Sequence, residues 1–416
     1  SIDSRWLEQG DSIPDDGSGN PLSLEQGESM ISQRVRTIEP SATLTLNAKI
    51  QELKKSGTKI LNLSVGEPDF PTPEFIRKAA MTAIDDGWTR YTAAAGHIEA
   101  REAICRHVER TRNVQVDPSQ VVISSGAKHC LSQTLLSLVD PGDEVLLSAP
   151  YWVSFPELIR LAEGVPLPVL TSARENHRLT PEMLEKQLTP RTTGIILNEP
   201  GNPTGLVSSA ADIAAIVDFA RTNDLWVISD EIYENLLHDG PMHSPFSYDP
   251  ERVALISGLS KSFAMTGWRI GWTVCNQELA GAIGRLQSHN SSNACTVSQA
   301  CVAAALDGHD HPDLQHMYDA FRERRDLMVD GLSKISGVNF SIPGGAFYIF
   351  VDLTERLGDG GVADDASDFA IRLLEQHEIA VVPGGAFGVS GCVRLSFARP
   401  QTELRQAIER IQAFLA

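Results

Sequence analysis

Short apolar runs alternate along the chain with stretches of amphipathic pattern. The runs end in glycine, proline or an acidic residue, and they are VVISSG (121–126), EVLLSAP (144–150), TGIILNEP (193–200), LWVISDE (225–231) and VALISG (253–258). Apolar runs without polar alternation are typical of strands buried on both faces, and the stretches between them, such as AADIAAIVDFARTND, have helical periodicity. The pattern predicts an α/β fold, a mostly parallel sheet sandwiched by helices, which we place at residues 70–319.

The pattern changes near residue 320. A long amphipathic stretch (316–335) predicts a helix, and GAFYIFVDL, IAVVPGGAFG and CVRLSFA predict short strands before a closing helix, ELRQAIERIQAFL. We expect these segments to form a smaller α+β domain from residues 30–69 and 320–416. Residues 1–29 contain seven acidic residues against one basic residue and are rich in Gly, Pro and Ser, so they predict a flexible N-terminal extension.

Charge and cysteine content narrow the classes of function. The formal net charge of −19 repels nucleic acid and anionic membranes, so any anionic ligand needs a local site. The six cysteines show no CxxC spacing, which argues against a zinc site and a disulfide framework. No apolar run approaches the roughly 18 residues of a membrane helix. We expect a cytoplasmic protein that acts on small molecules without a metal.

Polar residues that end the apolar runs are the first candidates for chemistry, because ligands of open α/β sheets bind beyond the carboxyl ends of the strands. The stretch SGLSKSFAMTGWRIGW (257–272) supplies Lys261 and Arg269. A nucleotide-binding P-loop is a poor match, since ALISGLSKS lacks both glycines of that motif. A lysine that captures an aldehyde cofactor as a Schiff base fits better, because a partly desolvated amine is a useful nucleophile.

An aldehyde cofactor of the pyridoxal type needs further partners, and the sequence offers one for each. Arg269 is available for the phosphate, Asp230 for the pyridine nitrogen, and Asn202 and Tyr233 for the phenolic oxygen. Trp152 of PYWVSF could stack on the ring. Taken singly, each residue has an ordinary structural interpretation, as a helix cap, a core aromatic or a surface lysine. Their joint occurrence favours a cofactor site.

The motifs resemble those of the class I aminotransferases, which are fold-type I pyridoxal-phosphate enzymes, and particularly the bacterial aspartate and prephenate aminotransferase branch. The resemblance extends from about Ser32 to the C-terminus and rests on LSVGEPDFPTP, TRYTAAAG, SSGAKH, PYWVSFPE, NEPGNPTG, SDEIYE, SKSFAMTGWRIGW, PGGAFYIF and VRLSFA, which occur in the family's order. It implies a seven-stranded, mostly parallel sheet, pyridoxal 5'-phosphate as cofactor, and a homodimer with shared active sites.

The resemblance also implies roles for individual residues. Lys261 would hold the cofactor and move the proton, Asp230 would pair with the ring nitrogen, and Tyr233 would bond the ring oxygen. The implied cofactor-binding residues are Gly126, Ala127, Lys128, Trp152, Asn202, Asp230, Tyr233, Lys261, Arg269 and Tyr91. Tyr91, with Ser292 and Asn293, would reach the neighbouring subunit's phosphate region.

For the substrate, the resemblance implies a clamp for the α-carboxylate. Arg394 would form a bidentate fork, a geometry that lysine cannot supply. The implied substrate-binding residues are Gly66, Lys128, Trp152, Asn202 and Arg394. In the aspartate branch the lysine at the place of Lys128 also binds the distal carboxylate. We interpret GEPD (66–69) as a turn, and we assign Glu67 and Asp69 no proton transfer.

Three functions remain to be compared. The first is an aminotransferase that moves the amino group of an aspartate-like L-amino acid to a 2-oxo acid such as 2-oxoglutarate by a ping-pong mechanism. The second keeps the cofactor and uses the same Schiff base for cyclisation, elimination or oxidation of an amino acid. The third is a cofactor-binding transcriptional regulator, for which the N-terminal extension is too short and too acidic to supply a helix-turn-helix.

Overall fold

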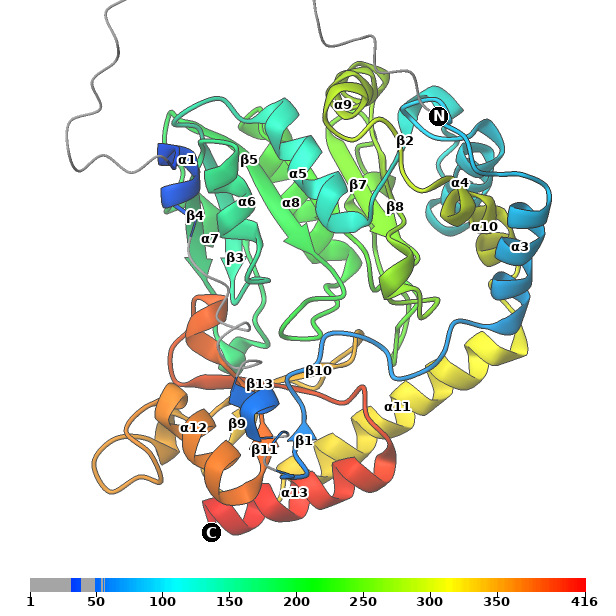
Figure 1. Ribbon diagram of the computed structural model, residues 1–416. Helices are drawn as coiled ribbons and strands as arrows, with labels where there is room; N and C mark the ends of the chain where they lie inside the picture. The colour runs from blue at the N-terminus through cyan, green and yellow to red at the C-terminus, as the bar shows by residue number, and fades with distance from the viewer. Residues whose placement is uncertain (1–30, 39–48, 54, 56) are drawn as a thin grey trace, which may run out of the picture.

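The computed structural model describes residues 31–38, 49–53, 55 and 57–416 (Figure 1). The predicted acidic extension, residues 1–29, lies outside the described residues, and the domain boundaries at residues 70 and 319 stay predictions. Within the part of the chain that is described, no helix is both long and apolar enough to cross a membrane.

A sheet of seven strands forms the centre of the larger part of the molecule. Its order is β2-β8-β7-β6-β5-β3-β4, and every neighbouring pair is parallel except the two pairs that β8 makes with β7 and β2. The predicted α/β fold with a mostly parallel sheet is therefore confirmed. The strands are β2 (Val121–Ser124), β3 (Glu144–Ala149), β4 (Val165–Leu170), β5 (Thr192–Asn198), β6 (Trp226–Asp230), β7 (Val253–Gly258) and β8 (Gly271–Val274).

Two of these strands do not come from the apolar runs of the sequence. β4 contains Pro166 and Pro168, which have no N–H to donate, and it lies at the edge of the sheet beside β3 alone. An edge strand can accommodate prolines because one side of its backbone needs no partner strand. β8 has only four residues, GWTV, and is too short to give a recognisable run.

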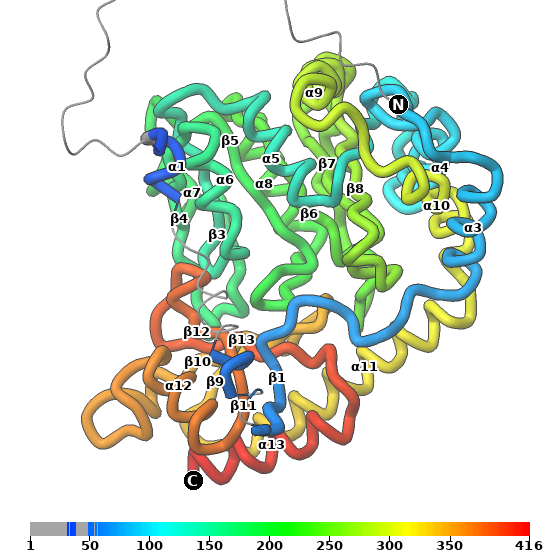
Figure 2. The backbone as a smooth tube through the Cα atoms, in the orientation of Figure 1, coloured from blue at the N-terminus to red at the C-terminus, as the bar shows by residue number. Residues whose placement is uncertain are grey.

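Helices cover both faces of the sheet (Figures 1 and 2). Successive strand residues face opposite sides, so Val121 and Ile123 belong to the core layer that includes α4, α8 and α10, whereas Val122 belongs to the layer that includes α5, α6 and α9. The helices of this part are α3 (Glu74–Asp85), α4 (Ile98–Arg112), α5 (Ala127–Leu138), α6 (Phe155–Leu161), α7 (Pro181–Glu185), α8 (Ala210–Thr222), α9 (Gln277–Asn290) and α10 (Thr296–Asp307); α1 (Gln33–Arg36) precedes them.

A second, smaller sheet lies below the first in Figure 1, as the change of pattern near residue 320 indicates. It is antiparallel with the order β12-β13-β10-β9, and β1 and β11 form a separate parallel pair. The long helix α11 runs from beside α3 to this sheet (Figure 1). The elements are β1 (Leu61–Asn62), α11 (Pro312–Leu332), β9 (Asn339–Phe340), β10 (Tyr348–Asp352), α12 (Ala366–His377), β11 (Ile379–Ala380), β12 (Val382–Pro383), β13 (Cys392–Ser396) and α13 (Gln401–Leu415).

The N-terminus of α5 has no side-chain cap, in contrast to those of α8 and α9. α8 begins after Ser209, whose hydroxyl accepts from the backbone of Asp212, and α9 begins after Asn276, whose side chain accepts from Leu279. Such caps satisfy backbone N–H groups that have no partner inside the helix. α5 begins after Gly126, which has no side chain to accept a hydrogen bond. The first N–H groups of this helix therefore lack a side-chain cap and remain available for a ligand.

Candidate active site

A cavity of about 740 Å³ lies where the carboxyl ends of β5, β6 and β7 face β10 and β13 of the second sheet. This is the position expected for a ligand site in an open α/β sheet. Most of the residues singled out from the sequence line it. These are Gly66, Ala127, Lys128, Trp152, Asn202, Asp230, Tyr233, Lys261, Arg269 and Arg394.

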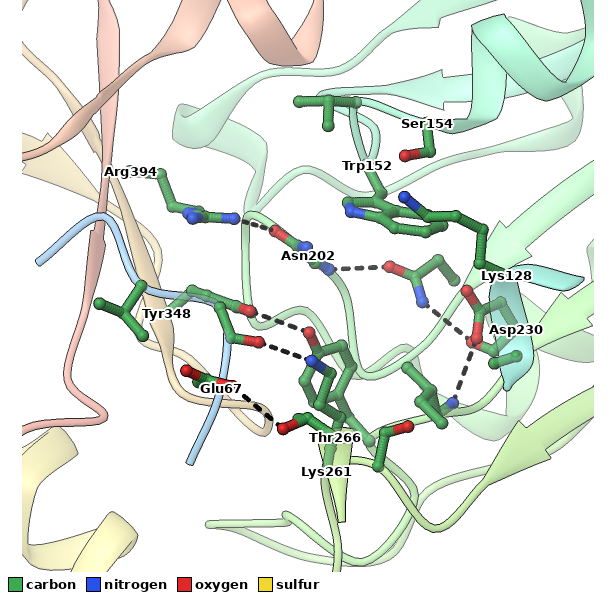
Figure 3. A pocket seen from close by; sticks show the side chains of 18 of the residues that line it. Glu67, Lys128, Trp152, Ser154, Asn202, Asp230, Lys261, Thr266, Tyr348 and Arg394 are labelled. Atoms are coloured by element: carbon green, nitrogen blue, oxygen red, sulfur yellow. Dashed lines mark hydrogen bonds between the residues drawn. The ribbon is translucent and has the colours of Figure 1, made fainter. Parts of the chain in front are cut away.

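The amine of Lys261 lies inside this cavity, in the loop that follows β7 (Figure 3). Its Nζ donates a hydrogen bond to the backbone oxygen of Gly66 at 2.5 Å. Burial lowers the pKa of Lys261 to about 8; the carboxylate of Glu67 acts against this shift, and the guanidinium of Arg394 adds to it. An amine with this pKa is uncharged in about a tenth of the molecules at pH 7, far more than an ordinary lysine, and the uncharged form is the one that attacks a carbonyl.

Asp230 ends β6 and is 3% exposed. Its Oδ1 accepts a hydrogen bond from the backbone N–H of Ile232 at 3.3 Å. Burial raises the pKa of Asp230 to about 7, and the neighbouring charge of Glu231 adds to the increase. A buried carboxyl with so few partners is suited to a cationic or proton-sharing group placed in the cavity.

A chain of hydrogen bonds leads from Arg394 on β13 to Asp230 (Figure 3). Arg394 Nη1 donates to Asn202 Oδ1 at 3.0 Å, and the backbone N–H of Asn202 donates to Asn198 Oδ1 at 2.9 Å. Asn198 Nδ2 then donates to the backbone oxygen of Asp230 at 3.0 Å. These bonds link Arg394 to the backbone at the end of β6, although the two segments are far apart in sequence.

Arg394 is buried without a carboxylate partner among the described residues. Besides Asn202 it donates to the backbone oxygen of Ser64 at 2.8 Å, and its Nε has no partner. Its guanidinium carbon lies 4.4 Å from the centre of the Tyr348 ring. Burial lowers the pKa of Arg394 from its usual value. A buried guanidinium without a carboxylate partner in the described part of the chain is suited to an incoming carboxylate.

The start of α5 and Arg269 form a cationic cradle at the other end of the cavity. Gly126 has φ of 91°, and a Cβ on it would come within 2.5 Å of Arg269 Nη2. Within the described part of the chain, Arg269 donates only to the backbone oxygens of Thr266 and Ser125. The uncapped helix start adds free N–H groups and the positive end of the helix dipole. This combination is suited to a phosphate.

Lys128 and Trp152 lie together at the cavity wall (Figure 3). The Nζ of Lys128 is 4.8 Å from the centre of the Trp152 ring. Burial lowers the pKa of Lys128, and the positive charge of Arg269 lowers it further. The ammonium has no carboxylate partner among the residues described, so it is free to meet an anionic group of a ligand.

The turn at residues 66–69 contributes more to the cavity than the sequence predicts. Glu67 lines the cavity, and its Oε2 accepts from the hydroxyl of Thr266 at 3.0 Å. Asp69 instead forms a bidentate ion pair with Arg324 of α11, with distances of 2.6 and 3.1 Å. The two acids therefore differ: one faces the site, and the other ties the turn to the long helix.

The structure does not bring every predicted residue into the cavity. Tyr91 is 87% exposed, and neither it nor Ser292 and Asn293 line the cavity of this chain. Their predicted contact with a neighbouring subunit stays a prediction. Gly126 does not line the cavity either, but it borders it through its contact with Arg269.

Among the cavity residues not singled out from the sequence, two hold hydrogen bonds at the centre of the site. Tyr348 on β10 places its hydroxyl 2.9 Å from that of Tyr233, and Asn198 ends β5 as Asp230 ends β6. Asn198 could have been found, because it is a polar residue at the end of an apolar run. Tyr348 could not, because its position depends on the register of β10 against β13, where Phe350 lies opposite Arg394.

A charged cluster lies behind β6, on the side away from the cavity. Arg112 of α4 pairs with Glu231 at 2.5 Å and with Glu234, and Ser257 donates to Glu234 at 2.6 Å. His107 Nε2 is 3.1 Å from Glu234. All are nearly inaccessible to solvent. The cluster holds the segment that contains Asp230 and Tyr233 against α4.

Comparison with known proteins assigns the chain to a family. Residues 58–411 match the family described as aminotransferase class I and II. The chain belongs to this family. The aminotransferase is 40% identical to an aspartate/prephenate aminotransferase of Cereibacter sphaeroides, over 93% of this chain and 98% of that protein. It is 38% identical to an aspartate aminotransferase of Geobacillus stearothermophilus, over 92% of this chain and 98% of the relative.

Solved structures give the same assignment. An aspartate aminotransferase from Thermus thermophilus with maleate superposes with a TM-score of 0.89 at 38% identity, covering 93% of this chain and all of the other. An aspartate aminotransferase from Rhizobium meliloti gives 0.89 at 36% identity, covering 93% and 98% of the two chains. The predictions of family and of an aminotransferase fold are confirmed.

The family depends on pyridoxal phosphate, and the cavity of this aminotransferase fits that group. The fit rests on the cradle at Gly126, which a Cβ would fill, and on the uncapped start of α5. It rests also on Asp230, a buried carboxyl with one hydrogen bond, and on an uncharged fraction of the Lys261 amine. A phosphate, a ring nitrogen and an aldehyde each meet a group of suitable chemistry.

Proposed function

We propose that this aminotransferase takes the amino group of a dicarboxylic L-amino acid, aspartate in the first place, and transfers it to a 2-oxo acid such as 2-oxoglutarate. Transfer would follow a ping-pong order, in which the first keto acid leaves before the second substrate binds. The observation that supports this most is the buried guanidinium of Arg394, which donates only to an amide and a backbone oxygen and has no carboxylate partner within the described residues. The names of the relatives point in the same direction.

In this proposal Arg269 and the start of α5 would hold the cofactor's phosphate, and Asp230 would pair with its ring nitrogen. The ring oxygen would accept hydrogen bonds from Tyr233 and from Asn202, whose Oδ1 already accepts from Arg394 so that its Nδ2 remains as the donor. When bound, pyridoxal phosphate supplies a carbonyl for the amine and an electron sink for the carbon that loses a proton.

Lys261 would be the general acid and base. Its Nζ lies in the cavity and has a pKa of about 8, so it can both take a proton from the substrate Cα and return one near neutral pH. The backbone oxygen of Gly66 accepts from this Nζ and orients it. Positioned proton transfer of this kind contributes about 10²–10⁴ in rate.

Substrate selection would use the two cationic ends of the cavity. Arg394 would bind the α-carboxylate, while Gly66 and Trp152 would border it. Lys128 would then bind the distal carboxylate, because it is a cation in the cavity wall without an ion-pair partner in the described part of the chain. A substrate with two carboxylates satisfies both cations, whereas an aromatic or basic side chain leaves Lys128 unmatched.

The assembly and location are also proposed. A homodimer would bring Tyr91 of the partner subunit, which is 87% exposed in the single chain, to the phosphate together with the segment at Ser292 and Asn293. The larger sheet, within residues 70–319, would form the cofactor-binding domain. The protein would act in the cytoplasm on small amino and keto acids.

The test is a visible absorbance scan of the cofactor-loaded protein with aspartate, glutamate, phenylalanine and lysine. We expect the band to change with aspartate and not with phenylalanine or lysine. Lys128→Met should raise the KM for aspartate about ten- to a hundredfold, the value of a charge-assisted hydrogen bond. Lys78→Met, which removes a surface lysine paired with Glu74, is the control and should leave KM unchanged.

Two outcomes would contradict the proposal. A preference for aromatic or basic amino acids would overturn the role of Lys128. Multiple turnovers of an amino acid without any 2-oxo acid would exclude simple transamination and favour elimination, cyclisation or oxidation instead.

A further inference from the structure

The hydroxyl of Tyr348 occupies an unusual position between two parts of the site. It lies 2.9 Å from the hydroxyl of Tyr233, and the ring that bears it lies under the guanidinium of Arg394 at 4.4 Å (Figure 3). Tyr348 is 1% exposed and lines the cavity. The residue therefore contacts both the proposed carboxylate clamp and the proposed partner of the cofactor oxygen.

The two hydroxyls have one hydrogen bond between them and two protons. Neither hydroxyl has another hydrogen-bond partner among the described residues. If Tyr233 donated to Tyr348, its only proton would be used, and it could not donate to a cofactor oxygen. If Tyr348 donates, the proton of Tyr233 is free to point into the cavity. The direction of this one bond decides what Tyr233 can do.

The surroundings favour Tyr348 as the donor. The cation of Arg394 over its ring withdraws electron density and makes its hydroxyl the more acidic of the two. Burial raises the pKa of both hydroxyls and the charge of Arg394 lowers both, but the guanidinium lies over the ring of Tyr348, and Tyr348 itself raises the pKa of Tyr233. The more acidic hydroxyl donates and the less acidic one accepts.

We propose that Tyr348 is a positioning residue: by donating to the oxygen of Tyr233, it turns the Tyr233 proton toward the ring oxygen of the bound cofactor. The ring of Tyr348 has a separate role, because it packs against the guanidinium of Arg394. This inference rests on the proposed function, because it requires pyridoxal phosphate in the cavity. The inference adds Tyr348, on β10 of the second sheet, to the residues that contribute to the site.

The direction of a spectroscopic shift tests the proposal. Tyr348→Phe removes the hydroxyl and keeps the ring. Without its donor, Tyr233 becomes a weaker donor, so the cofactor oxygen keeps more negative charge and the nitrogen that joins the cofactor to Lys261 holds its proton to higher pH. We expect the pH midpoint of the visible absorbance change to rise by a few tenths of a unit, on the order of a quarter of the rise in Tyr233→Phe.

A double-mutant cycle shows whether the hydroxyl acts through Tyr233. In the Tyr233→Phe background, Tyr348→Phe should no longer move the midpoint, because the residue on which it acts is gone. Tyr248→Phe is the control, since the Tyr248 hydroxyl bonds the backbone oxygen of Ala210 outside the cavity. It should leave the midpoint at the parental value.

A second variant separates the ring from the hydroxyl. Tyr348→Leu removes the ring below Arg394 and should raise the KM for aspartate about five- to thirtyfold, the value of a desolvated cation–π contact. Tyr348→Phe should leave KM within about twofold of the parent. The absorbance band itself reports whether each variant has folded and bound its cofactor.

The outcomes are distinguishable. An unchanged or lowered midpoint in Tyr348→Phe would overturn the inference, and so would an equal shift in the Tyr233→Phe background. If the parental protein loaded with pyridoxal phosphate had no visible band that responds to pH, the proposed function would fail, and the inference would fail with it. A raised midpoint that vanishes without Tyr233 supports both.

Discussion

Two buried arginines on opposite sides of β6 have different surroundings. Arg112 is 6% exposed and Arg394 is 5% exposed. Arg112 contacts two carboxylates, those of Glu231 and Glu234, and its pKa is raised by them. Among the residues that the structure describes, Arg394 has only an amide and a backbone oxygen as acceptors and one N–H without a partner, and its pKa is lowered.

The difference extends to the neighbouring acids. On the Arg112 side, the guanidinium and His107 lower the pKa of Glu234 far below its usual value, despite burial. On the Arg394 side, burial raises the pKa of Asp230 to about 7. Breaking a buried charge pair is costly because it leaves one charge without a partner, whereas charges that the fold already leaves unpaired remain available for a ligand. Substitutions in the paired cluster around Arg112 can therefore be compared with substitutions of the unpaired groups around Arg394.

The largest effect is expected from Lys261→Ala, on the cavity side. Turnover of aspartate should fall by at least about 10²–10⁴, because the general acid and base is lost, and the covalent link to the cofactor is lost as well. The stability of the cofactor-free protein should not fall, because a cation without an ion-pair partner among the described residues is removed from the cavity. Turnover and the urea midpoint of unfolding are measured together, with Lys334→Ala, a surface lysine paired with Asp330, as the control. Parental turnover in Lys261→Ala would refute the assignment of the catalytic lysine.

Arg112→Met should have the next largest effect, and it acts on stability. Removing this guanidinium leaves two buried carboxylates without a partner, at a cost of about 3–5 kcal/mol in the free energy of unfolding. Arg394→Met is the matched control, with the same substitution at equal burial, and should change the free energy of unfolding by less than about 1 kcal/mol while it impairs substrate binding. Urea unfolding of both variants measures the difference. Equal losses of stability would show that pairing does not distinguish the two sites.

The cavity residues at the ends of parallel strands could be predicted from the sequence. Asn202, Asp230 and Lys261 each follow a recognisable apolar run, and the carboxyl ends of parallel strands meet at one edge of a sheet. Local pattern is sufficient there, because the sheet brings the strand ends together whatever the exact register. Glu67 was interpreted as part of a turn only, since nothing near it in sequence indicates that it faces the cavity.

Contacts between distant segments could not be predicted. Arg112 and Glu231 are 119 residues apart in sequence, and each alone has the appearance of an ordinary charged residue of a helix or loop. Tyr348 depends on the pairing of β10 with β13, where a shift by one residue would turn its side chain to the other face. The motifs therefore indicate which residues take part in the chemistry. Which aromatic and charged residues contact them depends on how distant segments pair and pack in the tertiary structure.

The smallest expected effect is on how the free energy of unfolding depends on pH. The contributions of Asp230 and Glu234, on the two sides of β6, have opposite signs. The folded state holds a proton on Asp230 up to about pH 7, whereas the unfolded chain releases it near pH 4, so this group makes stability fall as pH rises between these values. Glu234 has a lowered pKa, so its contribution is complete above about pH 4.5 and is lost only as pH falls below that. Glu199, whose pKa burial raises to about 7, acts in the same direction as Asp230, so a difference between variants is needed.

The contribution of each carboxyl is obtained by subtracting the stability of its variant from that of the parental protein at each pH. Urea midpoints of the cofactor-free protein between pH 4 and 8 should show that Asp230→Asn removes part of the fall between about pH 4 and 7, on the order of 1–3 kcal/mol. Glu234→Gln should lower stability by a constant amount from pH 5 to 8, because the charge it removes is fully ionised there. If the Asp230→Asn profile ran parallel to the parental one, the buried carboxyl would be ionised throughout, and the contrast between unpaired and paired charges across β6 would not hold.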